Sequence, residues 1–207
     1  MSQQQQLSAK IIAIIRGVKA TEVIDVARVL VEAGIHSIEV PLNSPDPFVS
    51  IRKLADEYGR DIFIGAGTVL TVSDVEKVHA AGGRLVVSPN TNVDVISKTK
   101  ALGMISLPGF MTPTEAFAAI HAGADGLKLF PAGPNGVELL SALKAVLPSH
   151  IPVYPVGGVG PGNMSAFVQA GAAGFGLGSN LYKPGMTLQQ VSTNAQDAMA
   201  ACAKAFK

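Results

Sequence analysis

The sequence predicts an α/β fold, and within that class a single-domain (β/α)8 (TIM) barrel, on three observations. The chain has 207 residues, enough for one domain with a sizeable core. Eight short apolar segments alternate with stretches of helical periodicity. A glycine that follows a small or apolar residue recurs at Gly34, Gly82, Gly103, Gly123 and Gly171. The spacings of 48, 21, 20 and 48 residues each correspond to one or two strand–helix units.

The expected strands are near-continuous apolar runs, which are typical of a parallel sheet covered on both faces. Each run has glycine, proline or a small polar residue among its last two positions, where the chain is expected to turn toward the next helix. The eight segments are residues 11–17, 37–43, 63–69, 84–90, 104–110, 126–132, 153–159 and 174–180.

Helices are expected between these strands, because apolar residues there recur at helical spacing. Capping residues are expected at Thr21, Ser73 and Thr112. A doubly wound open sheet is the alternative, but it more often has a phosphate loop directly after its first strand. No linker interrupts the chain, so we expect one domain over 1–207, with a flexible N-terminus at 1–9.

Composition restricts the class of function. The 16 Lys and Arg residues nearly balance the 15 Asp and Glu residues, which argues against a nucleic-acid partner. The one cysteine, Cys202, excludes an internal disulfide and favours a reducing compartment. Because we find no secretion signal and no uncharged apolar run of about 18 residues, we expect no membrane partner.

Lys128 is the first candidate for chemistry, because active sites of such barrels lie at the carboxyl ends of the strands. It alternates with Leu127 and Leu129, so it points into the barrel if the leucines face the helices. Burial lowers the pKa of a lysine and frees the amine to attack a carbonyl. The alternative is a lysine at a strand edge that extends into solvent.

Glu39 shows the same alternation, between Ile38 and Val40. A carboxylate inside the barrel could exchange protons near neutral pH if its pKa were raised. The alternative is a structural ion pair with Lys128 or Arg16, which would be compatible with a catalytic role.

Two glycine-rich loops follow the last two expected strands, at Gly157-Gly158 and Gly178-Ser179. Such loops let backbone N–H groups approach an anion, and these two positions are the usual phosphate site of the fold. The alternative is that these glycines serve only to form tight turns, as glycines do in many strand–helix loops. No group of His, Asp and Glu has metal-ligand spacing, so we expect no metal and no cofactor. Together the residues favour Schiff-base chemistry on a phosphorylated keto compound.

Eight motifs, taken together, resemble the 2-keto-3-deoxy-6-phosphogluconate and 6-phosphogalactonate aldolases from about Ile11 to Tyr182. The resemblance implies a metal-free class I aldolase, homotrimeric and cytoplasmic, on a (β/α)8 barrel. It also implies cleavage of a phosphorylated keto sugar acid to pyruvate and glyceraldehyde 3-phosphate. The motifs, in order, are IIRG, IEVPLNSP, IGAGTVL, VSPN, LPG, GLKLFPA, VGGV and GLGS.

The resemblance also implies a role for each matched residue. Lys128 would form the Schiff base, and Glu39 would shuttle protons. Arg16 would bind the substrate through its carboxylate or a hydroxyl, and Thr68 would hold the pyruvyl part. The expected pocket-lining residues are Pro89 and Phe130, and the expected phosphate-binding residues are Gly157, Gly158, Gly178 and Ser179.

Asn43 and Val156 depart from the phosphogluconate branch, which has an arginine and a threonine there, and are similar to the phosphogalactonate branch. Asn43 removes a positive group, so Arg16 would carry more of the carboxylate binding. Valine cannot hydrogen-bond a hydroxyl, so discrimination at C4 should shift. The resemblance therefore favours 2-dehydro-3-deoxy-6-phosphogalactonate as substrate, with the phosphogluconate epimer as the alternative.

Two other classes stay open. A sugar-phosphate epimerase or isomerase usually needs a metal or two carboxylates, whereas the strand ends here offer mainly Glu39 beside a lysine. A non-catalytic phosphosugar-binding barrel would more often lack Lys128 or Glu39.

Overall fold

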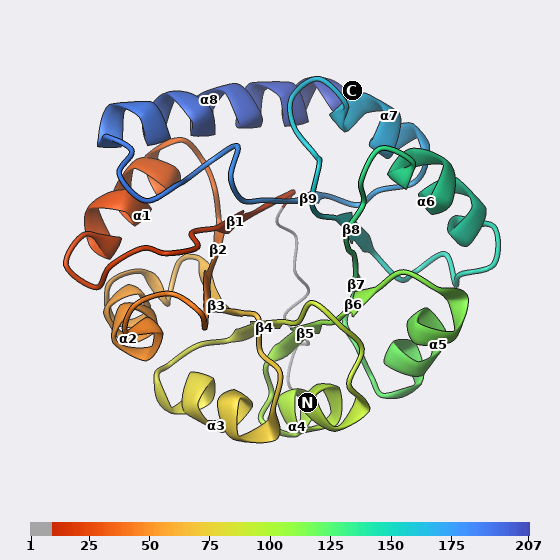
Figure 1. The fold of residues 1–207 in the computed structure, drawn as a ribbon, viewed down its shortest axis with the longest axis horizontal. Helices are drawn as coiled ribbons and strands as arrows, with labels where there is room; N and C mark the ends of the chain where they lie inside the picture. Colours follow the sequence, from red (N-terminus) through yellow and green to blue (C-terminus); the bar gives the residue numbers. More distant parts are fainter. Residues whose placement is uncertain (1–9) are drawn as a thin grey trace.

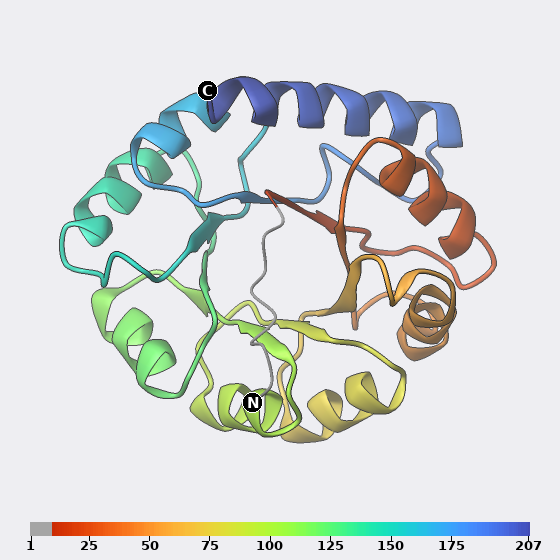
Figure 2. The same cartoon turned by 180° about the vertical axis from the view of Figure 1, so that it is seen from behind.

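The computed structural model describes residues 10–207, so the expected flexible N-terminus at 1–9 lies outside the described residues. Parallel strands curl around the centre, and the helices cover their outer side (Figure 1). The view from behind shows the same arrangement (Figure 2). The protein therefore has a TIM-like α/β fold with a curled parallel sheet.

The strands are short, and every pairing between them is parallel. In chain order they are β1 (Ile11–Ile14), β2 (Ser37–Pro41), β3 (Phe63–Gly67), β4 (Leu85–Val87), β5 (Ile105–Leu107), β6 (Gly109–Phe110), β7 (Leu127–Leu129), β8 (Val153–Pro155) and β9 (Phe175–Leu177).

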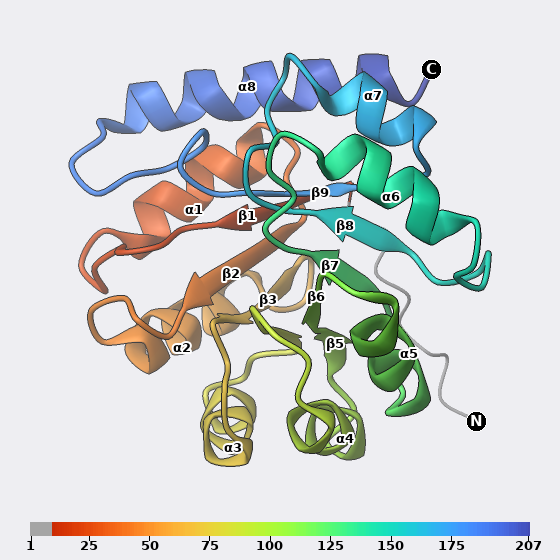
Figure 3. The same cartoon turned by 45° about the vertical axis from the view of Figure 1, so that its right-hand side comes forward.

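Helices follow most of these strands. They are α1 (Val23–Glu32), α2 (Pro47–Tyr58), α3 (Val72–Ala80), α4 (Val93–Ala101), α5 (Pro113–His121), α6 (Gly136–Lys144), α7 (Met164–Gln169) and α8 (Leu188–Ala205). The last and longest, α8, packs against α1 and α7, so the two ends of the described chain meet (Figure 3).

The sheet consists of two ladders, in the orders β5-β4-β3-β2-β1-β9 and β6-β7-β8. The first strand pairs with both β2 and the last strand, and the helices lie outside the curled strands (Figure 1). A doubly wound open sheet has helices on both faces, so the structure does not support that alternative.

The expected strand at 104–110 is interrupted at Pro108, which separates β5 from β6. Proline has no N–H to donate to a ladder. Its carbonyl still accepts a hydrogen bond of 2.9 Å from the Lys128 N–H. Every other strand is also shorter than its apolar run, so the ends of the runs form the loops that carry the candidate site.

Helix capping was predicted correctly only in part. Thr112 caps α5 in a full capping box. The cap of α3 is Thr71, not Ser73, because Thr71 accepts from the Asp74 N–H and so occupies the N-cap position. The N-cap position of α1 is Glu22 rather than Thr21, and its side chain makes no capping bond.

Two apolar clusters confirm the predicted alternation. The larger cluster joins strands to helices and contains Ile38, Val40, Leu127 and Leu129. The smaller one gathers side chains from β1, β4, β5 and β8, on the inner side of the curled strands. Its members are Ile12, Leu85, Val87, Ile105, Leu107 and Tyr154.

Candidate active site

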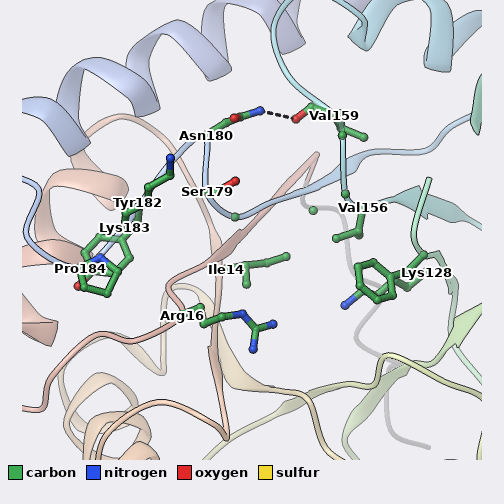
Figure 4. Close-up of a pocket in the computed structure, with 15 residues that line it drawn as sticks. Ile14, Arg16, Lys128, Val156, Val159, Ser179, Asn180, Tyr182, Lys183 and Pro184 are labelled. Carbon is green, nitrogen blue, oxygen red and sulfur yellow. Dashed lines mark hydrogen bonds between the residues drawn. The ribbon is translucent and has the colours of Figure 1, made fainter. Parts of the chain in front are cut away.

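A pocket of about 310 Å³ lies at the carboxyl ends of β1, β7, β8 and β9, a size suited to a small ligand. Arg16 and Lys128 line it, and their nitrogen ends point toward one another in Figure 4. This is the end of the strands at which TIM-like folds carry their active sites.

Lys128 projects from β7 and is only 6% exposed. Its Nζ lies 4.7 Å from the centre of the Phe130 ring. Burial lowers the pKa of Lys128, the Glu39 carboxylate opposes this, and the Arg16 charge adds to it. A larger fraction of the amine is therefore neutral than in an exposed lysine, which is the state required of a nucleophile.

Glu39 projects from β2 and is 1% exposed. Burial raises its pKa to about 7, although Lys128 and Arg16 act against this shift. Its Oε2 atom has no hydrogen-bond partner, and no ion pair within 4.0 Å joins it to Lys128 or Arg16 among residues 10–207. The structure therefore does not support the alternative of a structural ion pair.

Gly67, the last residue of β3, makes room for this carboxylate. A Cβ atom at this position would collide with the carboxylate oxygens of Glu39. The glycine of the IGAGTVL motif is thus explained by the side chain on the neighbouring strand.

Arg16, Asn43 and Thr68 meet at the ends of β1, β2 and β3. The Arg16 guanidinium donates to Asn43 Oδ1, and it lies 3.5 Å from Thr68 Oγ1. Thr68 has a φ of 56°, a left-handed conformation that is unusual for a β-branched residue and typical of functional sites. Both hydrogen-bond partners of Arg16 are uncharged, so its positive charge stays available to an anion.

The opposite side of the pocket consists of the two glycine-rich loops. Gly157 and Gly158 have φ values of 86° and 79°. Asn180 joins the loops, because its Nδ2 donates to the Val159 carbonyl at 2.8 Å (Figure 4). In the described part of the chain, the N–H groups of Gly158 and Ser179 donate to no acceptor, which leaves them free for an anion.

Most of the predicted site residues therefore converge. Glu39, Asn43 and Thr68 lie beside the pocket rather than in its lining. Pro89 follows β4 and is not in the lining; its backbone lies against Gly109 instead. The predicted residues that line the pocket are Arg16, Lys128, Phe130, Val156, Gly157, Gly158, Gly178 and Ser179.

Sequence reasoning missed the part of the lining that follows Ser179. Lys183 is an exposed cation there, and Tyr182 is a buried phenol. The signal available was their place in the loop directly after the GLGS motif. No group of three or more His, Cys, Asp or Glu residues within 10–207 is arranged to hold a metal ion.

Comparison with known proteins relates this arrangement to one family. The family model of KDPG and KHG aldolases matches residues 3–197. A probable 2-dehydro-3-deoxy-6-phosphogalactonate aldolase of Rhizobium meliloti (strain 1021) is 47% identical over 92% of this chain and 90% of its own. The 2-dehydro-3-deoxy-6-phosphogalactonate aldolase of Escherichia coli (strain K12) is 44% identical over 99% and 98%.

A solved structure described as native KDPGal superposes with a TM-score of 0.96, at 41% identity and over 99% of both chains. The described helices include none that is long and apolar enough to span a membrane. The chain belongs to the KDPG and KHG aldolase family.

Proposed function

We propose that this protein is a class I aldolase that cleaves 2-dehydro-3-deoxy-6-phosphogalactonate to pyruvate and D-glyceraldehyde 3-phosphate. The observation that carries the proposal is the buried amine of Lys128 in the pocket, close enough to Glu39 for each to shift the pKa of the other. The names of the two relatives support the choice of substrate.

The reaction begins when the neutral amine of Lys128 attacks the C2 carbonyl of the substrate. Glu39 relays protons as water leaves, and an iminium ion forms. Removal of the C4 hydroxyl proton then breaks the C3–C4 bond, and the electron pair moves into the iminium to give an enamine. Glyceraldehyde 3-phosphate departs, C3 is protonated, and hydrolysis of the iminium releases pyruvate and restores the amine.

Substrate binding uses both ends of the pocket. Arg16, supported by Asn43 and Thr68, binds the carboxylate end, while the glycine-rich loops bind the phosphate. Lys183 adds a positive charge on the phosphate side. Because the phosphate is remote from the bond that breaks, its binding energy serves to orient the substrate for cleavage.

Val156 supports the choice of C4 epimer. It is 7% exposed, lines the pocket and presents only methyl groups. Gly176 leaves it room, because a Cβ atom there would lie 2.6 Å from Val156 Cγ2. The same reaction on the phosphogluconate epimer is the second candidate, and comparing kcat/KM for the two epimers distinguishes them.

We also propose that the two ladders close into one (β/α)8 barrel that forms a single domain. Two contacts support closure: the bridge between Val156 and Gly176, and a 3.1 Å bond from the Asp125 N–H to the Ser106 carbonyl. In this reading, β5 and β6 are one strand.

The proposed assembly is a homotrimer in the cytoplasm. Five large apolar side chains that are 37–51% exposed lie in the loops and first helical turns that follow β2, β3, β4 and β6, and they are the residues we assign to the interface. Sedimentation of the full chain tests this, and a monomer would contradict it. The residues are Val49, Leu70, Val72, Val93 and Met111.

The decisive experiment is borohydride reduction in the presence of pyruvate, followed by peptide mass mapping. The expected result is an adduct on Lys128, and a Lys128→Met variant is the control. Absence of an adduct on folded protein would overturn the Schiff-base mechanism. A non-catalytic phosphosugar-binding barrel would then be the favoured interpretation.

A further inference from the structure

Tyr182 and Glu22 form a hydrogen bond between two loops that are far apart in the sequence. The Tyr182 hydroxyl donates to Glu22 Oε1 at 2.9 Å across 160 positions. Tyr182 is 3% exposed and lies in the loop between β9 and α8. Glu22 precedes α1 and is not in the pocket lining. The chemistry proposed above uses neither residue.

Each of these loops carries one end of the candidate site. The loop that contains Glu22 follows β1 and includes Arg16, at the carboxylate end. The loop that contains Tyr182 begins with Gly178 and Ser179, at the phosphate end. The hydrogen bond therefore connects the two groups that would hold the two ends of the substrate.

Additional contacts restrict the first loop. Glu22 Oε1 also accepts from the Lys19 N–H at 3.1 Å. The Gly17 N–H donates to Ser44 Oγ at 2.9 Å. Gly17 has a φ of 82°, and a Cβ atom there would lie 2.7 Å from Pro184 Cγ. The two loops thus touch at a second place, next to Arg16 itself.

The Tyr182–Glu22 bond is suited to a fixed structural role. Burial, and then the bond to Glu22, raises the pKa of the Tyr182 phenol, so it stays protonated and remains a donor. The bond is partly buried, and a hydrogen bond to a carboxylate is among the stronger kinds in proteins.

We propose that Tyr182 and Glu22 are positioning residues that set the span between Arg16 and the phosphate loops, and so select the length of the substrate's carbon chain. The proposal rests on the proposed function. A six-carbon substrate bound at both ends is sensitive to this span, whereas pyruvate is small enough to be bound at the carboxylate end alone.

The experiment compares two reactions in the full-length enzyme. The first is aldol synthesis from pyruvate with a three-carbon or a two-carbon aldehyde phosphate, glyceraldehyde 3-phosphate or glycolaldehyde phosphate. The second is exchange of the pyruvate methyl protons with heavy water, which needs no phosphate end. The variants are Glu22→Ala, Tyr182→Phe and Glu22→Gln, with Tyr58→Phe on α2 as the matched control.

We expect Glu22→Ala to lower kcat/KM for the three-carbon aldehyde about 10-fold, the effect of one partly buried hydrogen bond to a charged group. The preference for three carbons over two should fall by a similar factor, and pyruvate exchange should stay within about 2-fold. Tyr182→Phe should reduce the same preference, and the double variant should lose no more than either single variant. Glu22→Gln keeps an acceptor and should retain most of the preference.

An unchanged preference in Tyr182→Phe and Glu22→Ala would overturn the proposal. So would a parallel loss in both reactions, because that would indicate a general structural role. Tyr182→Phe removes a single hydroxyl, so it remains informative if Glu22→Ala does not fold. Borohydride trapping of pyruvate on the wild-type protein tests the proposed function separately: without an adduct the aldolase assignment fails, whatever the variants do.

Discussion

The buried pair of Lys128 and Glu39 and the phosphate-side loops of the candidate site work by different physical means. Lys128 and Glu39 are buried, and their pKa values shift because the surroundings disfavour charge. The phosphate side is formed by half-buried or exposed loops, with backbone N–H groups and the exposed Lys183. Substitutions of Lys128 or Glu39 should therefore reduce turnover, whereas substitutions in the phosphate-side loops should weaken substrate binding.

The largest expected effect is that of Lys128→Met, which keeps an unbranched side chain but removes the nucleophile. We expect kcat for aldol cleavage to fall roughly 10⁴-fold, because covalent catalysis is lost. Coupled detection of pyruvate measures it. Turnover within 10-fold of the wild type would contradict the assignment of Lys128.

Glu39→Gln should lower kcat by about 10² to 10³-fold, the usual contribution of a general acid–base group, with little change in KM. The wild-type profile of kcat/KM against pH should show an ionisation near the pKa of about 7, and the variant should lack it. A change in KM alone would rule out proton transfer by Glu39. Glu138→Gln, on the exposed face of α6, is the control.

Stability should also depend on Glu39. Because its pKa rises from 4.5 to about 7 in the folded state, the native protein binds this proton more tightly than the unfolded chain. The resulting stability is complete below pH 4.5 and is lost as the pH rises through 7, by about 3 kcal/mol in total. Urea unfolding from pH 4.5 to 8 should show this decline, and Glu39→Gln should reduce it. Parallel curves would contradict the effect of burial.

Lys183→Gln tests the contribution of the phosphate-side loops to substrate binding. We expect KM for the phosphorylated substrate to rise about 5-fold with kcat nearly unchanged, because an exposed charge contributes modestly to binding. Added salt should reduce the difference between the variant and the wild type. Lys204→Gln, on the exposed side of α8, is the control. If kcat fell while KM stayed constant, Lys183 would belong to the chemistry instead.

Val156→Thr should have the smallest effect, a shift of about 5-fold in the ratio of kcat/KM for the two C4 epimers toward the phosphogluconate form. The reason is that threonine adds a hydroxyl that can hydrogen-bond the C4 hydroxyl. Val159→Thr adds the same group elsewhere in the lining and serves as the control. An unchanged epimer ratio would remove Val156 as the basis of selectivity.

Local sequence determined the strand–helix alternation and the inward direction of Lys128 and Glu39. Side chains alternate across a strand, so their apolar neighbours specify which face each one occupies. Short-range sequence patterns also predicted the Thr112 cap and the glycine-rich loops. These features depend on residues only a few positions apart, which is why the sequence was sufficient to predict them.

The tertiary structure decided the rest. Whether Glu39 is paired or alone, whether Pro89 reaches the pocket, and whether Tyr182 meets Glu22 depend on residues from different strand–helix units. So does the role of Gly67, which shows only beside the carboxylate on the neighbouring strand. Strand pairing brings these groups together across as many as 160 positions, a separation at which local periodicity carries no information about contact.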